Sequence, residues 1–164
     1  MLSEFSMDFF SLKGKTAIVT GGNTGLGQGY VVAFAKAGAD LFVTTYDREW
    51  EETRKLVEAE GRKIHFFQAD LTERAQVSAA VQECMKVYGK IDILVNNAGT
   101  IRRAPLLEYK DSDWEAVMNI NLNAVYYMSQ DVAKIMVTQG SGKIINSFNA
   151  FISRRKICTS IYSK

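Results

Sequence analysis

Short apolar runs alternate with longer amphipathic segments through most of this chain, and this alternation constrains its fold more than any other feature. The short runs are rich in Val, Ile and Phe, which is typical of buried strands. The segments between them have the length and spacing of helices. Because such alternation builds βαβ units, the sequence predicts an α/β fold with a doubly wound parallel sheet.

The positions of the expected elements follow from these patterns and from the residues that end them. We expect strands at 16–20, 41–45, 64–69, 91–95 and 143–146, and helices at 28–36, 48–60, 72–88 and 111–137. Gly89 is expected to end the third helix. A doubly wound sheet usually has the strand order 3-2-1-4-5-6, so we expect a fold incomplete at its C-terminal side with an exposed fifth strand.

Composition restricts the compartment and the partners of the chain. At 164 residues with 47% apolar and 23% charged residues, the chain has the make-up of one soluble domain. It contains no apolar run near the ~18 residues of a membrane span, so we expect no membrane association. Its two cysteines, Cys84 and Cys158, are too few for a disulfide framework and favour the cytoplasm. A single histidine, His65, excludes a histidine-rich metal site, and we expect no metal.

The distribution of charge along the chain argues against a nucleic-acid partner, and we expect none. Residues 147–164 hold four of the 20 basic residues and none of the 18 acidic ones, so the rest of the chain carries a net charge of −2. A nucleic-acid-binding domain needs a basic face on its folded body. We expect a small-molecule ligand instead.

A glycine-rich segment, Thr20 to Gly27, joins the first strand to the first helix. Gly21 permits a tight turn, and Gly25 and Gly27 allow the backbone to approach a pyrophosphate at the helix N-terminus. Glycine clusters also form plain turns, but a place between strand and helix favours a Rossmann-like dinucleotide site. The other candidate contacts in this loop are Asn23, Thr24 and Leu26.

The glycine spacing, TGxxxGxG, resembles that of the short-chain dehydrogenase/reductase family, and residues 12–146 carry the resemblance. The segment Asn96 to Gly99 reads NNAG after the fourth strand, where the family uses these residues to brace the sheet beside the cofactor. The resemblance thus implies cofactor contacts at Asn97, Ala98 and Gly99. A plain turn is the alternative for this segment.

Two further positions match the family. Asp70 and Leu71 follow the third strand, where the resemblance implies an acidic contact to the adenine ring. Asn121 matches the helix asparagine of the family's catalytic tetrad, which holds a water in the proton relay. The alternatives are a residue beside a helix cap for Asp70 and a buried polar contact for Asn121.

The segment NNAGTIRRAPLLE resembles the sugar-acid branch of the family. The resemblance implies an oxidoreductase that moves a hydride between a nicotinamide cofactor and a sugar acid or keto-sugar acid, and homo-oligomers in full-length members. Arg102 and Arg103 can grip a substrate carboxylate. The alternative is that both arginines are solvated loop residues or interface contacts.

The choice of cofactor depends on the end of the second strand. An acid there would bind the adenosine ribose and favour NAD. Thr45 stands at that position, with Asp47 and Arg48 just beyond it. Asp47 favours NAD and Arg48 favours NADP, so we expect NAD and leave NADP open.

The C-terminal segment departs from the family. Asn149 stands where the active-site serine is expected, and Tyr162 and Lys164 do not have the YxxxK spacing. Reading plausible codons one base later restores a serine and tyrosine typical of the sugar-acid branch. We therefore expect a dinucleotide-binding domain at 1–146 and an aberrant, out-of-frame tail at 147–164, with little turnover. The alternative is a catalytically dead dinucleotide-binding module or the product of a pseudogene.

Overall fold

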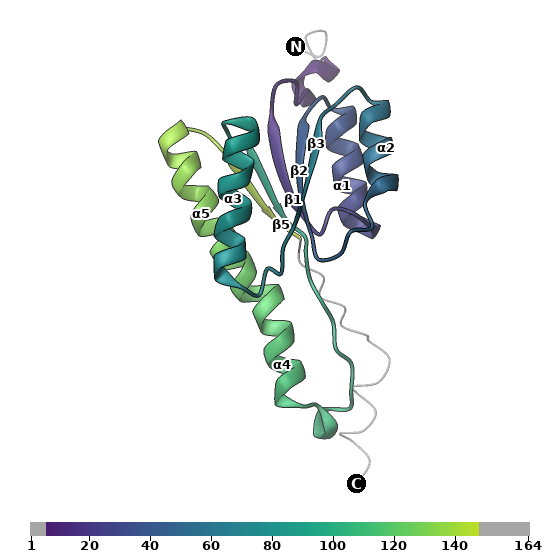
Figure 1. Cartoon of the computed structure of the whole chain (residues 1–164), viewed down its shortest axis with the longest axis vertical. Coiled ribbons are helices and arrows are strands. Elements are labelled where there is room, and N and C mark those ends of the chain that lie inside the picture. Colours follow the sequence, from purple (N-terminus) through teal and green to yellow (C-terminus); the bar gives the residue numbers. More distant parts are fainter. Residues whose placement is uncertain (1–5, 148–164) are drawn as a thin grey trace.

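Five parallel strands form one sheet at the centre of the molecule, and the computed structural model describes residues 6–147 (Figure 1). The strands are β1 (Thr16–Thr20), β2 (Asp40–Thr45), β3 (Ile64–Gln68), β4 (Ile93–Asn96) and β5 (Lys143–Asn146). Their order, β3-β2-β1-β4-β5, is that of the first five strands of a doubly wound sheet. The predicted Rossmann-like α/β fold is therefore confirmed.

Helices cover both faces of this sheet (Figure 1). On one face lie α1 (Gly25–Lys36) and α2 (Glu51–Ala59), and on the other lie α3 (Arg74–Tyr88) and α5 (Ala124–Gln139). A shorter helix, α4 (Asp111–Met118), extends beyond the carboxyl ends of the strands. Two short 3-10 turns lie at Met7–Phe10 and Leu106–Glu108.

The two apolar cores arise from the alternation of side chains along the central strands. Ile18 is in register with Phe42 and Leu94, and these three pack with the helices α3 and α5. The neighbouring residues Val19, Val43 and Val95 are likewise in register and pack on the opposite face with α1 and α2. Because both faces are covered, the middle residues of β1, β2 and β4 are apolar on both sides of the sheet.

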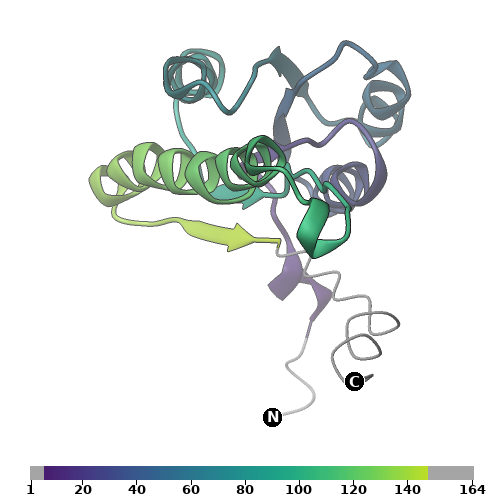
Figure 2. The ribbon, with the colours of Figure 1, turned by 90° about the horizontal axis from the view of Figure 1, so that it is seen from below.

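The fifth strand is an outer edge of the sheet within the described residues. It pairs with β4 alone, and Ile144 and Ile145 remain 38% and 43% exposed. Figure 2 shows β5 at the rim of the sheet, with α5 beside it. The expected exposed fifth strand is confirmed.

Several helix boundaries differ from the sequence expectation. The first helix begins at Gly25 rather than at residue 28, so the last glycines of the loop belong to its first turn. The second helix spans Glu51–Ala59, shorter at both ends than 48–60. Gly89 ends α3 with φ of 73°, as its position predicts.

The long helix expected at 111–137 is interrupted in its middle. Residues Asn119–Asn123 form a π-helical segment between α4 and α5, and the amide of Ala124 bonds to the carbonyl oxygen of Asn119. The apolar spacing of the sequence does not reveal this widening, because a single π turn changes the period over only a few residues.

In the described part of the chain, no helix is long and apolar enough to cross a membrane.

Candidate functional site

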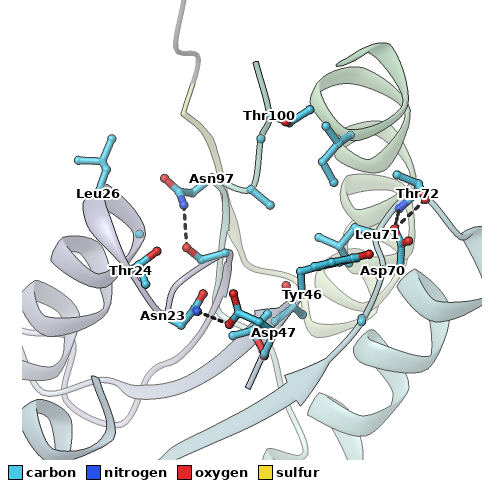
Figure 3. A pocket seen from close by; sticks show the side chains of 18 of the residues that line it. Asn23, Thr24, Leu26, Tyr46, Asp47, Asp70, Leu71, Thr72, Asn97 and Thr100 are labelled. Atoms are coloured by element: carbon cyan, nitrogen blue, oxygen red, sulfur yellow. Dashed lines mark hydrogen bonds between the residues drawn. The ribbon is translucent and has the colours of Figure 1, made fainter. Parts of the chain in front are cut away.

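A cavity of about 680 Å³ lies at the carboxyl ends of the central strands (Figure 3). The loop after β1, the end of β2 and the loops after β3 and β4 line it. The sheet reverses its winding between β1 and β4, and ligands of open α/β sheets bind at such a point. The predicted contacts that line the cavity are Gly21, Asn23, Thr24, Leu26, Gly27, Asp47, Asp70, Leu71, Asn97, Ala98, Gly99 and Arg102.

Three residues predicted to belong to the site do not line the cavity. Gly25 begins α1 with φ of 55°, so the backbone conformation alone accounts for a glycine there. Arg103 is exposed outside the cavity wall. Asn121 is exposed, so the alternative of a buried polar contact is wrong, and its side chain bonds to the backbone of the cavity residue Thr100.

The glycine loop folds back tightly on itself. Gly21 turns the chain with φ of 61°, and its amide donates to the carbonyl oxygen of Thr44 at 2.8 Å. A Cβ atom at Gly27 would lie 2.0 Å from the carbonyl oxygen of Gly21 and 2.6 Å from Nδ2 of Asn97. Gly27 therefore allows the loop to close against itself, and the approach of its backbone to a pyrophosphate stays a prediction.

The NNAG segment is fastened to the end of β1. The hydroxyl of Thr20 accepts hydrogen bonds from the backbone amides of Asn97 and Ala98, both at 2.9 Å. The side-chain amide of Asn97 donates to the carbonyl oxygens of Thr20 and Gly21 at 3.0 and 3.1 Å. This geometry is the brace that the resemblance implies, and it is more than a plain turn.

Asn96, the first residue of the same segment, ties β4 to its neighbours. Its side-chain amide donates to Oγ of Ser129 on α5 at 2.9 Å and to Oδ1 of Asn146 on β5 at 2.8 Å. The residue is 3% exposed, so these bonds satisfy a buried amide. Asn96 thereby links both α5 and β5 to the end of β4.

The acid nearest to the end of β2 is held in place by its surroundings. Oδ1 of Asp47 accepts from Nδ2 of Asn23 at 2.9 Å (Figure 3). The same oxygen accepts from the amide of Glu49 at 3.2 Å. The buried hydroxyl of Thr45 donates to the carbonyl oxygen of Asp47 at 2.7 Å. Arg48 instead donates through Nε to Oε1 of Gln68 at 2.9 Å and does not line the cavity.

The carboxylate of Asp70 has a local structural role as well as a place on the cavity wall. Oδ1 of Asp70 accepts from the amide of Thr72 at 2.9 Å and from its hydroxyl at 2.7 Å. These bonds fix the turn that leads into α3, as the alternative interpretation beside a helix cap predicts. They engage only one of the two carboxylate oxygens.

Asn121 holds the loop after β4 through both ends of its amide. Its Oδ1 accepts from the amide of Thr100 at 2.8 Å, and its Nδ2 donates to the carbonyl oxygen of Thr100 at 2.9 Å. Asn121 lies at the centre of the π-helical segment. The widened turn thus directs this side chain toward the cavity loop rather than along the helix.

The two arginines of the loop after β4 differ in position. Arg102 lines the cavity, and its Nε lies 3.7 Å from Oδ1 of Asp113 at the start of α4. Both arginine side chains are exposed. The structure therefore brings only Arg102 to the site.

Some cavity residues were not predicted from the sequence. The missed residues are Thr44, Thr45, Tyr46, Ala69, Thr72, Thr100, Ala116 and Ile120. Tyr46 and Thr72 directly adjoin predicted residues, so their place after a strand was an available signal. Ala116 lies on α4 and Ile120 on the π-helical segment, and the position of these elements over the cavity depends on tertiary packing.

Among residues 6–147, no group of three or more His, Cys, Asp or Glu side chains is arranged to hold a metal ion.

The residues at which the sequence departs from the family's catalytic serine and YxxxK pattern lie beyond the part of the chain that the structure describes. Asn149, Tyr162 and Lys164 all fall in residues 148–164. The boundary of the expected tail at residue 147 stands at the last described position.

The family model of the short chain dehydrogenases matches residues 15–163. This match reaches beyond Asn146, where we expected the resemblance to end, and includes most of the expected tail. One relative, the Uncharacterized oxidoreductase YgcW of Escherichia coli (strain K12), is 45% identical over 150 residues, which is 92% of this chain and 58% of that protein. The 2-dehydro-3-deoxy-D-gluconate 5-dehydrogenase of the same strain is 47% identical over 138 residues, 84% of this chain and 54% of that protein.

Solved structures give the same result. The crystal structure of NAD+-bound xylitol dehydrogenase matches with a TM-score of 0.79 and 29% identity, over 82% of this chain and 52% of that one. The chain spans about half the length of the curated relatives it matches. The fold, the glycine loop and the braced NNAG segment agree with these matches, and the chain belongs to the short-chain dehydrogenase family.

Proposed function

We propose that this chain binds a nicotinamide dinucleotide in the cavity at the carboxyl ends of its strands. The observation that carries the proposal is the closed glycine loop between β1 and α1, fastened to the NNAG segment at the winding reversal of the sheet. A cavity of about 680 Å³ is within the range of about 300–1,000 Å³ of ligand sites.

The start of α1 suits the pyrophosphate of such a ligand. Thr24 precedes the helix and makes no side-chain capping bond to its first turn. Unbonded amides and the positive end of the helix dipole favour an anion at this place. Thr24, Leu26 and Gly27 line the cavity beside it, so the residues present fit a dinucleotide.

We propose NAD rather than NADP as the cofactor. Oδ1 of Asp47 is held by Asn23 and by the amide of Glu49, which fixes a carboxylate on the wall at the β2 end of the cavity. A fixed carboxylate can accept hydrogen bonds from ribose hydroxyls and repels a 2′-phosphate. Arg48, the residue that would favour NADP, is bonded to Gln68 away from the cavity.

The substrate that we propose is a sugar acid or keto-sugar acid. Support comes from the relative named 2-dehydro-3-deoxy-D-gluconate 5-dehydrogenase and from the guanidinium of Arg102 on the cavity wall. A guanidinium binds a carboxylate through two parallel hydrogen bonds. Arg103 lies outside the cavity and is not included in this contact.

The bound nicotinamide would supply the acceptor or donor of a hydride. Asn121, the residue that the resemblance matches to the family's proton relay, fixes the loop at Thr100 through both ends of its amide. The 164 residues contain no tyrosine followed by a lysine four positions later, the pair that transfers the proton in the family. We propose a dinucleotide-binding domain at 1–146 and an out-of-frame segment at 147–164, and we expect little turnover by these 164 residues.

A second candidate function is a dinucleotide-binding module without catalysis. The observation that favours it is the contrast between a complete glycine and NNAG constellation and the missing tyrosine–lysine spacing. An assay of the purified chain with NAD and 2-dehydro-3-deoxy-D-gluconate separates the two functions. Turnover at ordinary enzyme rates, about 1–1,000 per second, would exclude this module and contradict the proposed inactivity.

Compartment and assembly complete the proposal. The buried thiol of Cys84 has a pKa raised to about 12 by burial, so it is not a reactive thiol at neutral pH. We propose a cytoplasmic protein whose full-length relatives form homo-oligomers.

Calorimetry with NAD and with NADP tests the cofactor proposal. We expect the chain to bind NAD more tightly than NADP. Asp47→Asn should weaken NAD by about tenfold, because a charged acceptor is lost, and should leave NADP unchanged or tighter, because the carboxylate that repels the 2′-phosphate is neutralised. The Asn side chain can still accept from Asn23, and Glu49→Gln is the matched control. Absence of binding by demonstrably folded protein would refute the dinucleotide site. An unchanged ratio of the two affinities in Asp47→Asn would refute the role of Asp47.

A further inference from the structure

We propose that Thr53, a buried threonine on α2, is a positioning residue that sets the preference of the cavity between NAD and NADP. This inference rests on the proposed function, because it concerns the carboxylate of Asp47 on the cavity wall. Thr53 does not line the cavity and belongs to none of the sequence motifs. It acts through the residue that holds this carboxylate.

The complete burial of Thr53 calls for hydrogen-bond partners. Thr53 and Val57 lie one turn apart on the buried face of α2, and both are 0% exposed. A valine would fill the same space as Thr53, so packing alone does not require a threonine there. Burying a hydroxyl costs free energy unless hydrogen bonds replace those that it makes with water. The partners of this hydroxyl therefore indicate its role.

Both the donor and the acceptor capacity of the hydroxyl are used. Oγ1 of Thr53 donates to the carbonyl oxygen of Asn23 in the glycine loop at 2.8 Å. It accepts from Nε2 of Gln28 on α1, also at 2.8 Å. In a helix a threonine hydroxyl can instead turn to a carbonyl oxygen of the preceding turn, so the bond from Gln28 favours the orientation toward Asn23.

Asn23 carries this constraint to the cavity wall. The residue is 8% exposed, and its Nδ2 donates to Oδ1 of Asp47 at 2.9 Å (Figure 3). The same nitrogen donates to the carbonyl oxygen of Glu49 at 3.2 Å. Residues 46–50 lie between β2 and α2 and belong to no helix or strand, so side-chain bonds of this kind fix their conformation.

The carboxylate of Asp47 is held by one oxygen and open at the other. Within the described residues, the hydrogen bonds that it accepts all go to Oδ1. Oδ2 can therefore accept from ribose hydroxyls, while the negative charge repels a 2′-phosphate. Without the hydroxyl of Thr53, Asn23 loses its support and the carboxylate can turn away, which weakens NAD and relieves the repulsion of NADP. The hydroxyl of Thr53 thus favours NAD.

Calorimetry with NAD and with NADP on the full chain tests this inference, and the ratio of the two affinities is the readout. Thr53→Val keeps the shape of the side chain and removes the hydroxyl. We expect it to weaken NAD by about 2- to 10-fold, the effect of about one hydrogen bond, and to leave NADP unchanged or tighter. Thr53→Ser keeps the hydroxyl and should show the ratio of the parent.

Gln28→Leu is a second variant, which serves if Thr53→Val does not fold. It removes the donor that orients the hydroxyl, so the ratio of NAD to NADP affinity should fall by about twofold. Thr16→Val is the matched control, because Thr16 is 3% exposed at the start of β1, at the opposite end of this strand from the cavity. Its ratio should equal that of the parent.

An unchanged ratio in folded Thr53→Val, even with a lower free energy of unfolding, would assign the hydroxyl to the fold alone and overturn this inference. So would a ratio in Thr53→Ser as low as in Thr53→Val or, if Thr53→Val does not fold, an unchanged ratio in Gln28→Leu. A folded parent that binds neither dinucleotide would overturn the proposed function as well. A parent that binds both equally would overturn the cofactor proposal together with this inference.

Discussion

Replacing Thr20 by valine should destabilise the protein, because one hydroxyl joins two strand ends. Oγ1 of Thr20 accepts from the amides of Asn97 and Ala98 at 2.9 Å and donates to the carbonyl oxygen of Val95 at 3.4 Å. Valine has the same shape but accepts nothing, so two amides lose their partner. Each such loss costs about 1–3 kcal/mol, and these amides are half-buried, so we expect about 2–4 kcal/mol in total.

Urea denaturation measures this loss directly. At a slope of about 2 kcal/mol per molar urea, the middle of the usual range, the midpoint of Thr20→Val should fall by about 1–2 M. Thr44→Val is the matched control, since Thr44 is 1% exposed at the end of β2 and its hydroxyl has no hydrogen-bond partner within the described residues. The control should be neutral or stabilising. Equal midpoints for the two variants would refute the reasoning.

Two further predictions concern the close approach at Gly27 in the glycine loop and the ion pair between Arg74 on α3 and Asp131 on α5. Gly27→Ala should lower the free energy of unfolding by several kcal/mol, since its Cβ would lie 2.0 Å from the carbonyl oxygen of Gly21. On the same helix a Cβ at Gly29 meets nothing within 4 Å, so Gly29→Ala should raise the free energy of unfolding by about 0.5–1 kcal/mol. The opposite ranking in chemical denaturation would contradict the structure. Hydrogen bonds from Arg74 lower the pKa of Asp131 to about 2, below its value of about 3.9 in the unfolded chain, so its contribution is complete above about pH 4 and is lost as the pH falls toward 2. Asp131→Asn should flatten the dependence of stability on pH in that window, and an unchanged slope would show that this pair does not set it.

The strands were the part of the fold that could be read from the sequence. Ile18 and Val19 face opposite apolar cores, so a short run without polar interruption marks a strand buried on both faces. Gly89 marked the end of α3 because only a residue that tolerates positive φ ends a helix in this way. Both signals depend only on residues close together in the sequence, so they predict the structure without knowledge of the tertiary contacts.

The features that could not be read from the sequence depend on contacts between distant segments. The π-helical turn at Asn119–Asn123 brings Asn121 to Thr100, which lies 21 positions earlier in the chain. Gly27 is required by the carbonyl oxygen of Gly21, not by a ligand alone. Arg102 and Arg103 are neighbours of the same type, and only the path of the loop decides that Arg102 alone reaches the cavity.

Hydrogen exchange of the full chain with and without NAD tests the central claim most directly, because it locates the ligand as well as detecting it. The account predicts slower exchange on NAD binding in the loops at 20–28, 44–48, 69–73 and 96–101, which line the cavity, and unchanged exchange through Ala124–Gln139 of α5. Protection confined to α5, or no change in the four loops at saturating NAD, would contradict the assignment of this cavity as the dinucleotide site.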